Sequence, residues 1–317
     1  MKAVVTVLLL MLLPLSQSFA NALPNYVKQS GVYGSISSTG SDTLAGMMTL
    51  WVEAFNRLYP GISIQVQASG SSTAPPALIG GTAQLGPMSR PMRTKEIEAF
   101  VNHYGYQPTQ LIVAIDAIGV FVYRDNPIKG LNFSQIDSIY SATLRCGSVK
   151  PITTWSQLGL KEEWAKRSIQ IFSRNTISGT YGYFKDHALC GGDYKSRVNE
   201  LPGSSSVVQS VASAINTIGY SGVGYQTSGV RLLPIAQTGT EYIAPTRVNI
   251  LSGRYPLTRY LYVYINKAPN KPLPATTRAF IRFIFSSQGQ ALVVKDGYVP
   301  ISNKIAQREL AKAGLTR

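Results

Sequence analysis

Four short segments of this sequence carry serine, threonine and glycine residues between an expected strand and the start of an expected helix. They are residues 38–43, 69–73, 86–90 and 178–180. The first turn of a helix exposes backbone N–H groups with partial positive charge, hydroxyl groups add hydrogen-bond donors, and glycine lets a ligand approach the backbone. Segments of this kind can bind an anion without a metal.

One of the four segments has an arginine close by. Arg174 lies four residues before Ser178, where an alternating apolar run over residues 169–172 ends. Arginine binds a tetrahedral oxyanion through paired N–H groups, so residues 174–180 are the strongest candidate. The alternative for any single segment is an ordinary helix cap, because serine, threonine and aspartate are common capping residues. The four segments together predict these anion-binding residues: Asp42, Thr43, Ser71, Ser72, Ser89, Arg90, Arg174, Ser178, Gly179 and Thr180.

Strands and helices that alternate along the chain must position these segments. The pattern predicts an α/β fold with mixed sheets flanked by helices, including helices over residues 133–146 and 274–297. Two long β-rich runs, residues 111–127 and 255–267, bracket the middle of the chain. We therefore expect two lobes with a ligand-binding cleft between them, the middle block being otherwise an insertion within one domain.

The expected boundaries follow from the two long β-rich runs. Residues 33–115 and 250–317 form a discontinuous first lobe, and residues 116–249 form the second lobe. The chain leaves the first lobe, builds the second and returns.

Residues 1–22 are typical of a secretory signal peptide. Lys2 supplies the positive start, residues 3–15 supply the apolar stretch, and small residues favour cleavage near Ala20 or Ala22. An uncleaved membrane anchor is the alternative, but the apolar run is short for a membrane span. We expect a periplasmic or secreted protein without stable membrane insertion.

The chain has two cysteines, Cys146 and Cys190. In an oxidising compartment they are expected to form a disulfide bond, with two buried free thiols as the alternative. His103 and His187 do not cluster with them in the sequence, so we expect no metal site and no cofactor.

The chain is strongly basic, because Lys+Arg 30 and Asp+Glu 15 give a net charge of +15. This charge favours anionic partners, whether nucleic acid, anionic membrane surfaces or small anions. The basic residues follow no stripe in the sequence and no nucleic-acid-binding module is present, so nucleic acid is not expected to be the partner.

Residues 33–300 resemble the periplasmic phosphate-binding proteins of bacterial ABC importers. In that family the motif of the second domain is an arginine, three residues and then Ser-Gly-Thr, and residues 174–180 match this spacing. Residues 68–89 resemble the Gly-Ser-Ser helix start of the family and its Phe/Leu-Gly strand end. Residues 214–225 and 253–267 resemble later signature segments.

The resemblance implies a two-lobed periplasmic-binding-protein-like fold with phosphate in the interdomain cleft. The matching positions, which the resemblance implies as phosphate ligands, are Ser71, Arg174, Ser178, Gly179 and Thr180. It further implies ABC importer membrane subunits as partners, and we expect a monomer.

Two positions depart from the family pattern. Arg90 stands where many members carry an aspartate, and Asp42 stands where they carry a threonine. Near neutral pH phosphate retains a proton and sulfate does not, so a carboxylate in the site can accept a hydrogen bond from phosphate alone. Asp42 is therefore our candidate for the acceptor, and the alternative is that it only caps its helix while Arg90 points to solvent.

The expected function is the capture of inorganic phosphate for an ABC importer. The sequence has no Gly-x-Ser-x-Gly elbow, no His-Glu-x-x-His and no P-loop, so we do not expect an enzyme. A phosphate-ester hydrolase is a weaker alternative. The main alternative is a secreted or surface-associated anion-binding protein with a matrix, adhesion or signalling role, which the basic charge also fits.

Overall fold

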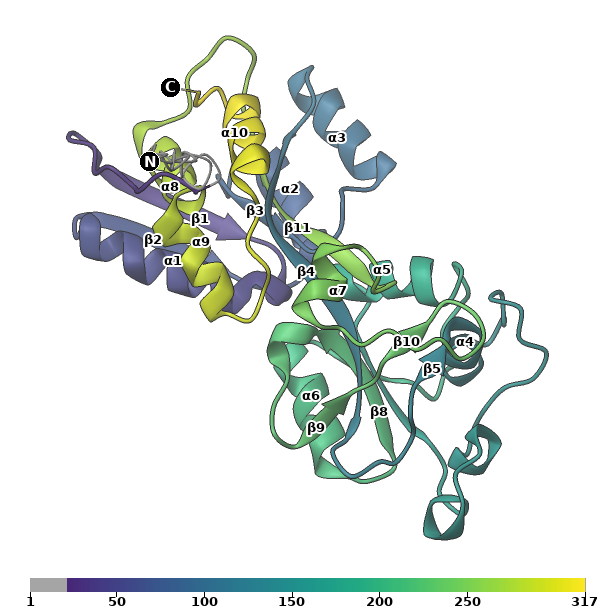
Figure 1. The fold of residues 1–317 in the computed structure, drawn as a ribbon. Coiled ribbons are helices and arrows are strands. Elements are labelled where there is room, and N and C mark those ends of the chain that lie inside the picture. The colour runs from purple at the N-terminus through teal and green to yellow at the C-terminus, as the bar shows by residue number, and fades with distance from the viewer. Residues whose placement is uncertain (1–21, 317) are drawn as a thin grey trace, which may run out of the picture.

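The computed structural model describes residues 22–316, which form two lobes joined by long strands (Figure 1). The strands are β1 Gly34–Thr39, β2 Ile62–Gln67, β3 Gly86–Met88, β4 Thr109–Tyr123, β5 Leu131–Asn132, β6 Gln170–Arg174, β7 Asn199–Leu201, β8 Thr217–Gly222, β9 Val230–Leu232, β10 Ile235–Ala236 and β11 Thr258–Ile265. The α-helices are α1 Ala45–Leu58, α2 Ala74–Ile79, α3 Thr94–Tyr104, α4 Phe133–Tyr140, α5 Gly179–Ala188, α6 Ser204–Ser213, α7 Arg247–Leu251, α8 Ala275–Ile284, α9 Ser287–Lys295 and α10 Asn303–Lys312. Short 3-10 helices cover Asp42–Leu44, Ser71–Thr73, Trp155–Leu158, Glu162–Trp164 and Val223–Tyr225.

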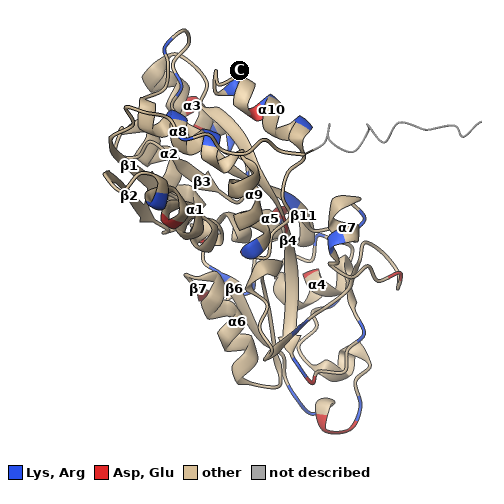
Figure 2. Ribbon diagram, turned by 60° about the vertical axis from the view of Figure 1, so that its left-hand side comes forward, with Lys and Arg blue, Asp and Glu red and all other residues tan. Residues whose placement is uncertain are grey.

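Strand β4 runs from one lobe into the other (Figures 1 and 2). Its first part, through Ala117, pairs with β11, and its second part, from Ile118, pairs with β8 and β9. The result is one sheet with the order β3-β11-β4-β8-β6-β7, in which β9 also pairs with β4. A long run of β-branched and apolar residues, broken by Asp116, explains this length, since both faces of the strand are buried over most of it.

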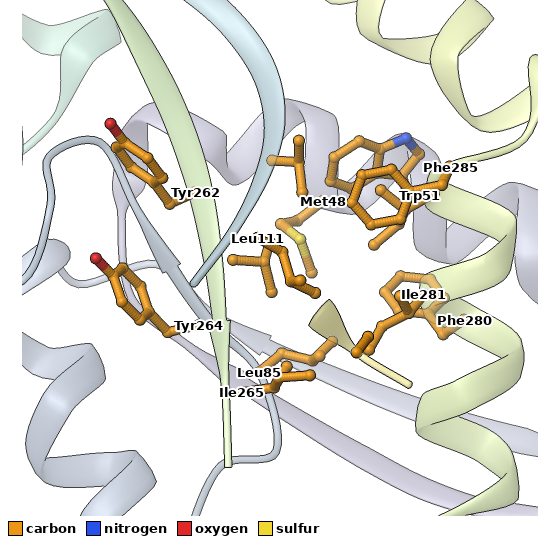
Figure 3. Close-up of a cluster of buried hydrophobic side chains, with 14 of the residues drawn as sticks. Met48, Trp51, Leu85, Leu111, Tyr262, Tyr264, Ile265, Phe280, Ile281 and Phe285 are labelled. Atoms are coloured by element: carbon orange, nitrogen blue, oxygen red, sulfur yellow. The ribbon is translucent and has the colours of Figure 1, made fainter. Parts of the chain in front are cut away.

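Each lobe has its own hydrophobic core. The core of the first lobe combines α1 with the C-terminal helices, and Trp51, Met48 and Phe280 lie within it (Figure 3). Helix α1 forms because its apolar side chains recur at three- and four-residue steps, which places them on one buried face. The core of the second lobe is built around β4, β6 and β8 and includes Trp155 and Tyr220. The two cores draw on the outer and middle parts of the chain, although the exact lobe boundaries stay a prediction.

A β-bulge in the first lobe shows how the C-terminal helices are fixed. The register of β4 against β11 shifts between Leu261 and Tyr262. Buried side chains then satisfy the β4 backbone there: Glu309 of α10 accepts from the N–H of Ile112, and Gln290 of α9 donates to the carbonyl of Val113. Both helices are thereby tied to the strand that joins the lobes.

Two expected helices differ from the prediction. The helix expected over residues 133–146 ends at Tyr140, because Ser141 is extended and its hydroxyl accepts from the N–H groups of Thr143 and Leu144. The helix expected over residues 274–297 is two helices, α8 and α9. Ser286 interrupts it by capping α9, where its hydroxyl accepts from Gly289 N–H.

The Cys146–Cys190 disulfide is present, with a Cα–Cα distance of 5.4 Å, which confirms the expected pairing. Among residues 22–316, no group of histidine, cysteine, aspartate or glutamate side chains has the arrangement of a metal site. Within the same residues, no helix is long and apolar enough to cross a membrane. The expected signal peptide lies outside the described residues, apart from Ala22.

Candidate anion-binding site

The start of helix α5 forms the second-lobe side of the predicted site. Ser178 is extended and caps the helix, and its hydroxyl oxygen accepts from the backbone N–H groups of Thr180 at 3.1 Å and Tyr181 at 3.5 Å. This cap leaves the hydroxyl proton of Ser178 free to donate to another group. Strand β6 ends at Arg174, so the arginine and the helix start lie on either side of one short turn.

The first-lobe side is formed by two helix starts and the end of β3. Ser71 begins the 3-10 helix before α2, and its hydroxyl oxygen accepts from the backbone N–H of Ser89 at 3.0 Å. The hydroxyl groups of Ser71 and Ser89 lie 3.2 Å apart. Thr43, in the 3-10 helix before α1, is also buried. Ser71 and Ser89, which come from separate segments, are thus side by side.

The two sides touch each other directly. The hydroxyl oxygens of Thr43 and Thr180 are 2.9 Å apart, and the N–H of Ser72 donates to the carbonyl of Ile177 at 3.1 Å. Gly179 sits against Ser71, since a Cβ atom at this glycine would lie 2.3 Å from the hydroxyl oxygen of Ser71. Only glycine permits this approach without a shift of one lobe.

Arg174 is buried at this junction, with 1% of its surface exposed. One terminal nitrogen donates to the hydroxyl of Ser204 and lies 3.2 Å from Asp42 Oδ2, and the other donates to the carbonyl of Pro202 at 2.7 Å. Its Nε–H has no protein acceptor among the described residues. Burial lowers the pKa of Arg174, and the nearby Asp42 carboxylate opposes this effect. The guanidinium is therefore held in place by second-lobe groups and keeps unused N–H donors.

Asp42 contacts the opposite lobe. Its Oδ2 accepts from the backbone N–H of Ser204, the first residue of α6, at 2.8 Å, and the same oxygen pairs with Arg174. Asp42 is the first residue of its own 3-10 helix, but its side chain bonds to Ser204 and Arg174, so the alternative in which it only caps that helix is wrong. It instead supplies a carboxylate to a helix start in the second lobe, where negative charge is favoured.

Arg90 is 5% exposed, so the alternative in which it points to solvent is wrong. Its guanidinium forms an ion pair with Glu96 of α3 at 2.7 Å and donates to the hydroxyl of Ser72 at 3.1 Å. Burial alone would raise the pKa of Glu96, but the hydrogen bonds and charge of Arg90 bring that pKa below its ordinary value. Arg90 therefore holds the hydroxyl group of Ser72 in position.

Two charged residues at the site were missed in the sequence. Arg259 of β11 donates to the hydroxyl of Thr180 and to the carbonyl of Ser89, both at 3.0 Å, so one guanidinium contacts both lobes. Its Nε donates to Asp116 Oδ2 of β4 at 2.8 Å. Burial raises the pKa of Asp116, an effect that Arg259 opposes.

The second oxygen of Asp116 has no partner. Oδ1 is buried and accepts no hydrogen bond within the described residues. A buried carboxylate oxygen without a donor is costly and usually has a function or an unseen partner. In the sequence, each of these two otherwise apolar strands carries one charge, and the two charges are opposite in sign. Considered one strand at a time, neither charge indicated a pair at the site.

The comparisons with known proteins agree with this geometry. The family described as PBP superfamily domain matches residues 27–288. The chain is 55% identical over 295 residues to the phosphate-binding protein PstS of Pseudomonas aeruginosa, covering 93% of this chain and 91% of that protein. This chain belongs to the PBP superfamily, and within it to the family of that PstS protein. A more distant relative is the protein SphX of Synechococcus elongatus, 25% identical over 297 residues and covering 92% of this chain and 85% of that protein.

Two solved structures support the two-lobed fold. A putative phosphate ABC transporter substrate-binding protein from Clostridium perfringens, solved with bound phosphate, has a TM-score of 0.71 and 25% identity, and the match covers 84% of this chain and all of that one. An ABC-type phosphate transport receptor from Vibrio cholerae has a TM-score of 0.64 at 23% identity, covering 84% of this chain and 100% of that one. The expected fold class and family resemblance are confirmed.

Proposed function

We propose that this chain is an extracytoplasmic solute-binding protein that captures inorganic phosphate in the cleft between its lobes for an ABC importer. The observation that carries the proposal is the meeting of hydroxyl groups and buried arginines from both lobes at one junction. There Thr43 contacts Thr180, and Arg259 contacts Thr180 and Ser89. Membership of the PstS family supports phosphate as the anion.

Each group has a defined role in this proposal. Arg174 and Arg259 supply N–H donors, and hydroxyl groups of Ser71, Ser178 and Thr180 donate to phosphate oxygens. The helix starts add backbone N–H groups. No covalent step occurs, and we infer that the protein is not an enzyme.

Phosphate selectivity requires a carboxylate that is free to accept a hydrogen bond. Oδ2 of Asp42 already accepts from Ser204 and pairs with Arg174, whereas Oδ1 of Asp116 is buried without a donor. We therefore infer that Asp116 accepts the proton of hydrogen phosphate and that Asp42 serves lobe closure. Sulfate carries no proton, so the same oxygen would repel it.

Lobe closure couples binding to transport in this proposal. Thr43, Ser72 and Asp42 reach across the cleft to Thr180, Ile177 and Ser204. These contacts can exist only when the lobes meet, so an anion that joins them favours the closed form. A periplasmic location after removal of the signal peptide near Ala20 or Ala22 completes the proposal.

The test is isothermal titration of the mature protein with phosphate, sulfate and a phosphonate. We expect micromolar or tighter binding of phosphate, no measurable binding of sulfate, and a smaller radius of gyration by X-ray scattering once phosphate is added. A protein that fails to bind phosphate, or that turns over a phosphate ester, would contradict the proposal.

A further inference from the structure

The positive charge of the chain is concentrated in its last segment. Residues 257–317 contain ten lysines and arginines and two acidic residues, Asp296 and Glu309, which gives +8 of the +15 total. The segment makes up about a fifth of the chain, so the charge is not spread evenly along the sequence. Its helices α8, α9 and α10 all lie in the first lobe (Figure 1).

Helix α10 carries three of these cations on one face. Lys304, Arg308 and Lys312 are spaced four residues apart, which aligns their side chains along the helix. The opposite face, with Ala306 and Leu310, is buried against the lobe. All three of these cations are exposed, and Figure 2 shows α10 at the edge of the first lobe.

Other cations border the same helix. Arg282 of α8 shares a surface groove with residues of α10, and Arg278 lies one turn earlier on α8. Lys267 lies beside the end of α10, since a Cβ atom at Gly314 would be 3.9 Å from its Nζ. We name this surface the C-terminal basic face, made of Lys267, Arg278, Arg282, Lys304, Arg308 and Lys312.

One carboxylate partly offsets the charge of the face. Glu309 is fully buried, accepts from Ile112 N–H, and pairs with Arg308 at 2.7 Å and Lys312 at 2.8 Å. Both cations remain substantially exposed, with 55% and 39% of their side chains accessible. Six positive charges against one negative charge leave the face at +5.

We propose that the C-terminal basic face docks the protein on an anionic lipid surface. Lysine and arginine near such a surface gain free energy from its negative potential without inserting into it. No exposed aromatic side chain lies on α8 or α10 to stack on bases, which disfavours single-stranded nucleic acid. The face belongs to the distal part of the first lobe, away from the junction of the lobes, so docking leaves the anion site accessible (Figure 1).

The test compares two variants of equal charge. Lys267→Gln/Arg278→Gln/Lys304→Gln removes three cations of the face, none of which forms an ion pair within residues 22–316. The matched control, Lys129→Gln/Lys150→Gln/Lys161→Gln, removes three exposed lysines of the second lobe. Thermal unfolding establishes that both variants fold as the wild type does.

Binding is measured by co-sedimentation with vesicles of equal parts phosphatidylglycerol and phosphatidylcholine, at about 0.1 M salt. The wild type is expected to bind these vesicles and not pure phosphatidylcholine. The face variant should bind about tenfold more weakly or worse, and the control should change less than about twofold. Absent wild-type binding, equal losses in the two variants, or tighter face-dependent binding to duplex DNA would each overturn the proposal.

Discussion

Replacing Asp116 by asparagine tests which carboxylate distinguishes phosphate from sulfate. The substitution keeps the shape of the side chain and an oxygen that can accept from Arg259. It replaces a carboxylate oxygen by an amide, which can donate to a fully deprotonated anion. We therefore expect the Asp116→Asn protein to bind sulfate, which the wild type rejects.

The magnitude follows from the environment of Oδ1. This oxygen is buried and has no donor among the described residues, so a hydrogen bond from the phosphate proton would be its only compensation. A hydrogen bond that involves a charged group contributes about 1.5–3 kcal/mol. The preference for phosphate over sulfate should therefore fall by about 10- to 100-fold.

Loss of the buried ion pair with Arg259 complicates the absolute affinities. The side chains of Asp116 and Arg259 are almost completely buried, and disruption of such a pair destabilises a protein by about 3–5 kcal/mol. The measured quantity is therefore the ratio of the phosphate and sulfate dissociation constants, determined by titration on one preparation. A general weakening of the site cancels in that ratio.

Asp42→Asn is the matched control. Its carboxylate lies across the cleft against Ser204 and Arg174, so its loss should weaken both anions together through poorer closure and leave the ratio unchanged. If sulfate competes with phosphate in Asp42→Asn but not in Asp116→Asn, then Asp42 is the selective residue and our assignment is refuted.

Three further substitutions test other parts of the structure. Gly179→Ala should weaken phosphate binding by roughly 5- to 100-fold and prevent compaction in X-ray scattering, because the new Cβ would collide with Ser71; unchanged binding would contradict the closed arrangement. Burial raises the pKa of Asp296 to about 6, so the folded state becomes less stable as pH rises from about 4 to 6. Asparagine does not titrate, so the stability of Asp296→Asn relative to the wild type should rise by up to about 1 kcal/mol between thermal melts at pH 4.5 and at pH 7. A constant difference between those melts would count against the titration. Replacing both Cys146 and Cys190 by serine should cost about 4 kcal/mol in chemical denaturation, since the bond closes a loop of 44 residues, with phosphate affinity unchanged; a loss of affinity would mean that the bond shapes the site.

The sequence predicted the helix starts of the site well because their signal is local. Ser71, Ser178 and Thr180 lie where an extended run meets glycine and hydroxyl residues, and such junctions expose N–H groups in any α/β fold. Arg174 was selected for the same reason, since it ends strand β6 just before one of these junctions. The long run that became β4 was likewise predicted as a crossing strand, because few short strands need so many consecutive apolar residues.

The contacts across the cleft could not be predicted from the sequence. Asp42 meets Ser204, which lies 162 positions later in the chain, and no local pattern indicates that pairing. Arg90 was predicted as an anion ligand, with a solvent-exposed orientation as the alternative, and neither reading included its ion pair with Glu96 of the next helix. Asp116 lies in the middle of β4 and Arg259 is the second residue of β11, and a charge within a strand is normally interpreted as an isolated structural feature. Their pairing depends on the register of β11 against β4, which only the structure gives.

The charges of the site and of the whole chain have different causes. The three buried arginines at the cleft are each paired with a carboxylate; the pairs are Arg174 with Asp42, Arg259 with Asp116, and Arg90 with Glu96. These pairs cancel, so an anion in the cleft is stabilised mainly by oriented N–H and O–H groups, which also respond to whether a ligand oxygen carries a proton. The last fifth of the chain supplies +8 of the net charge, and all but Arg259 of its cations lie outside the pairs at the cleft. The high net charge is therefore not a consequence of anion binding in the cleft, and it requires a separate explanation at the surface where it accumulates.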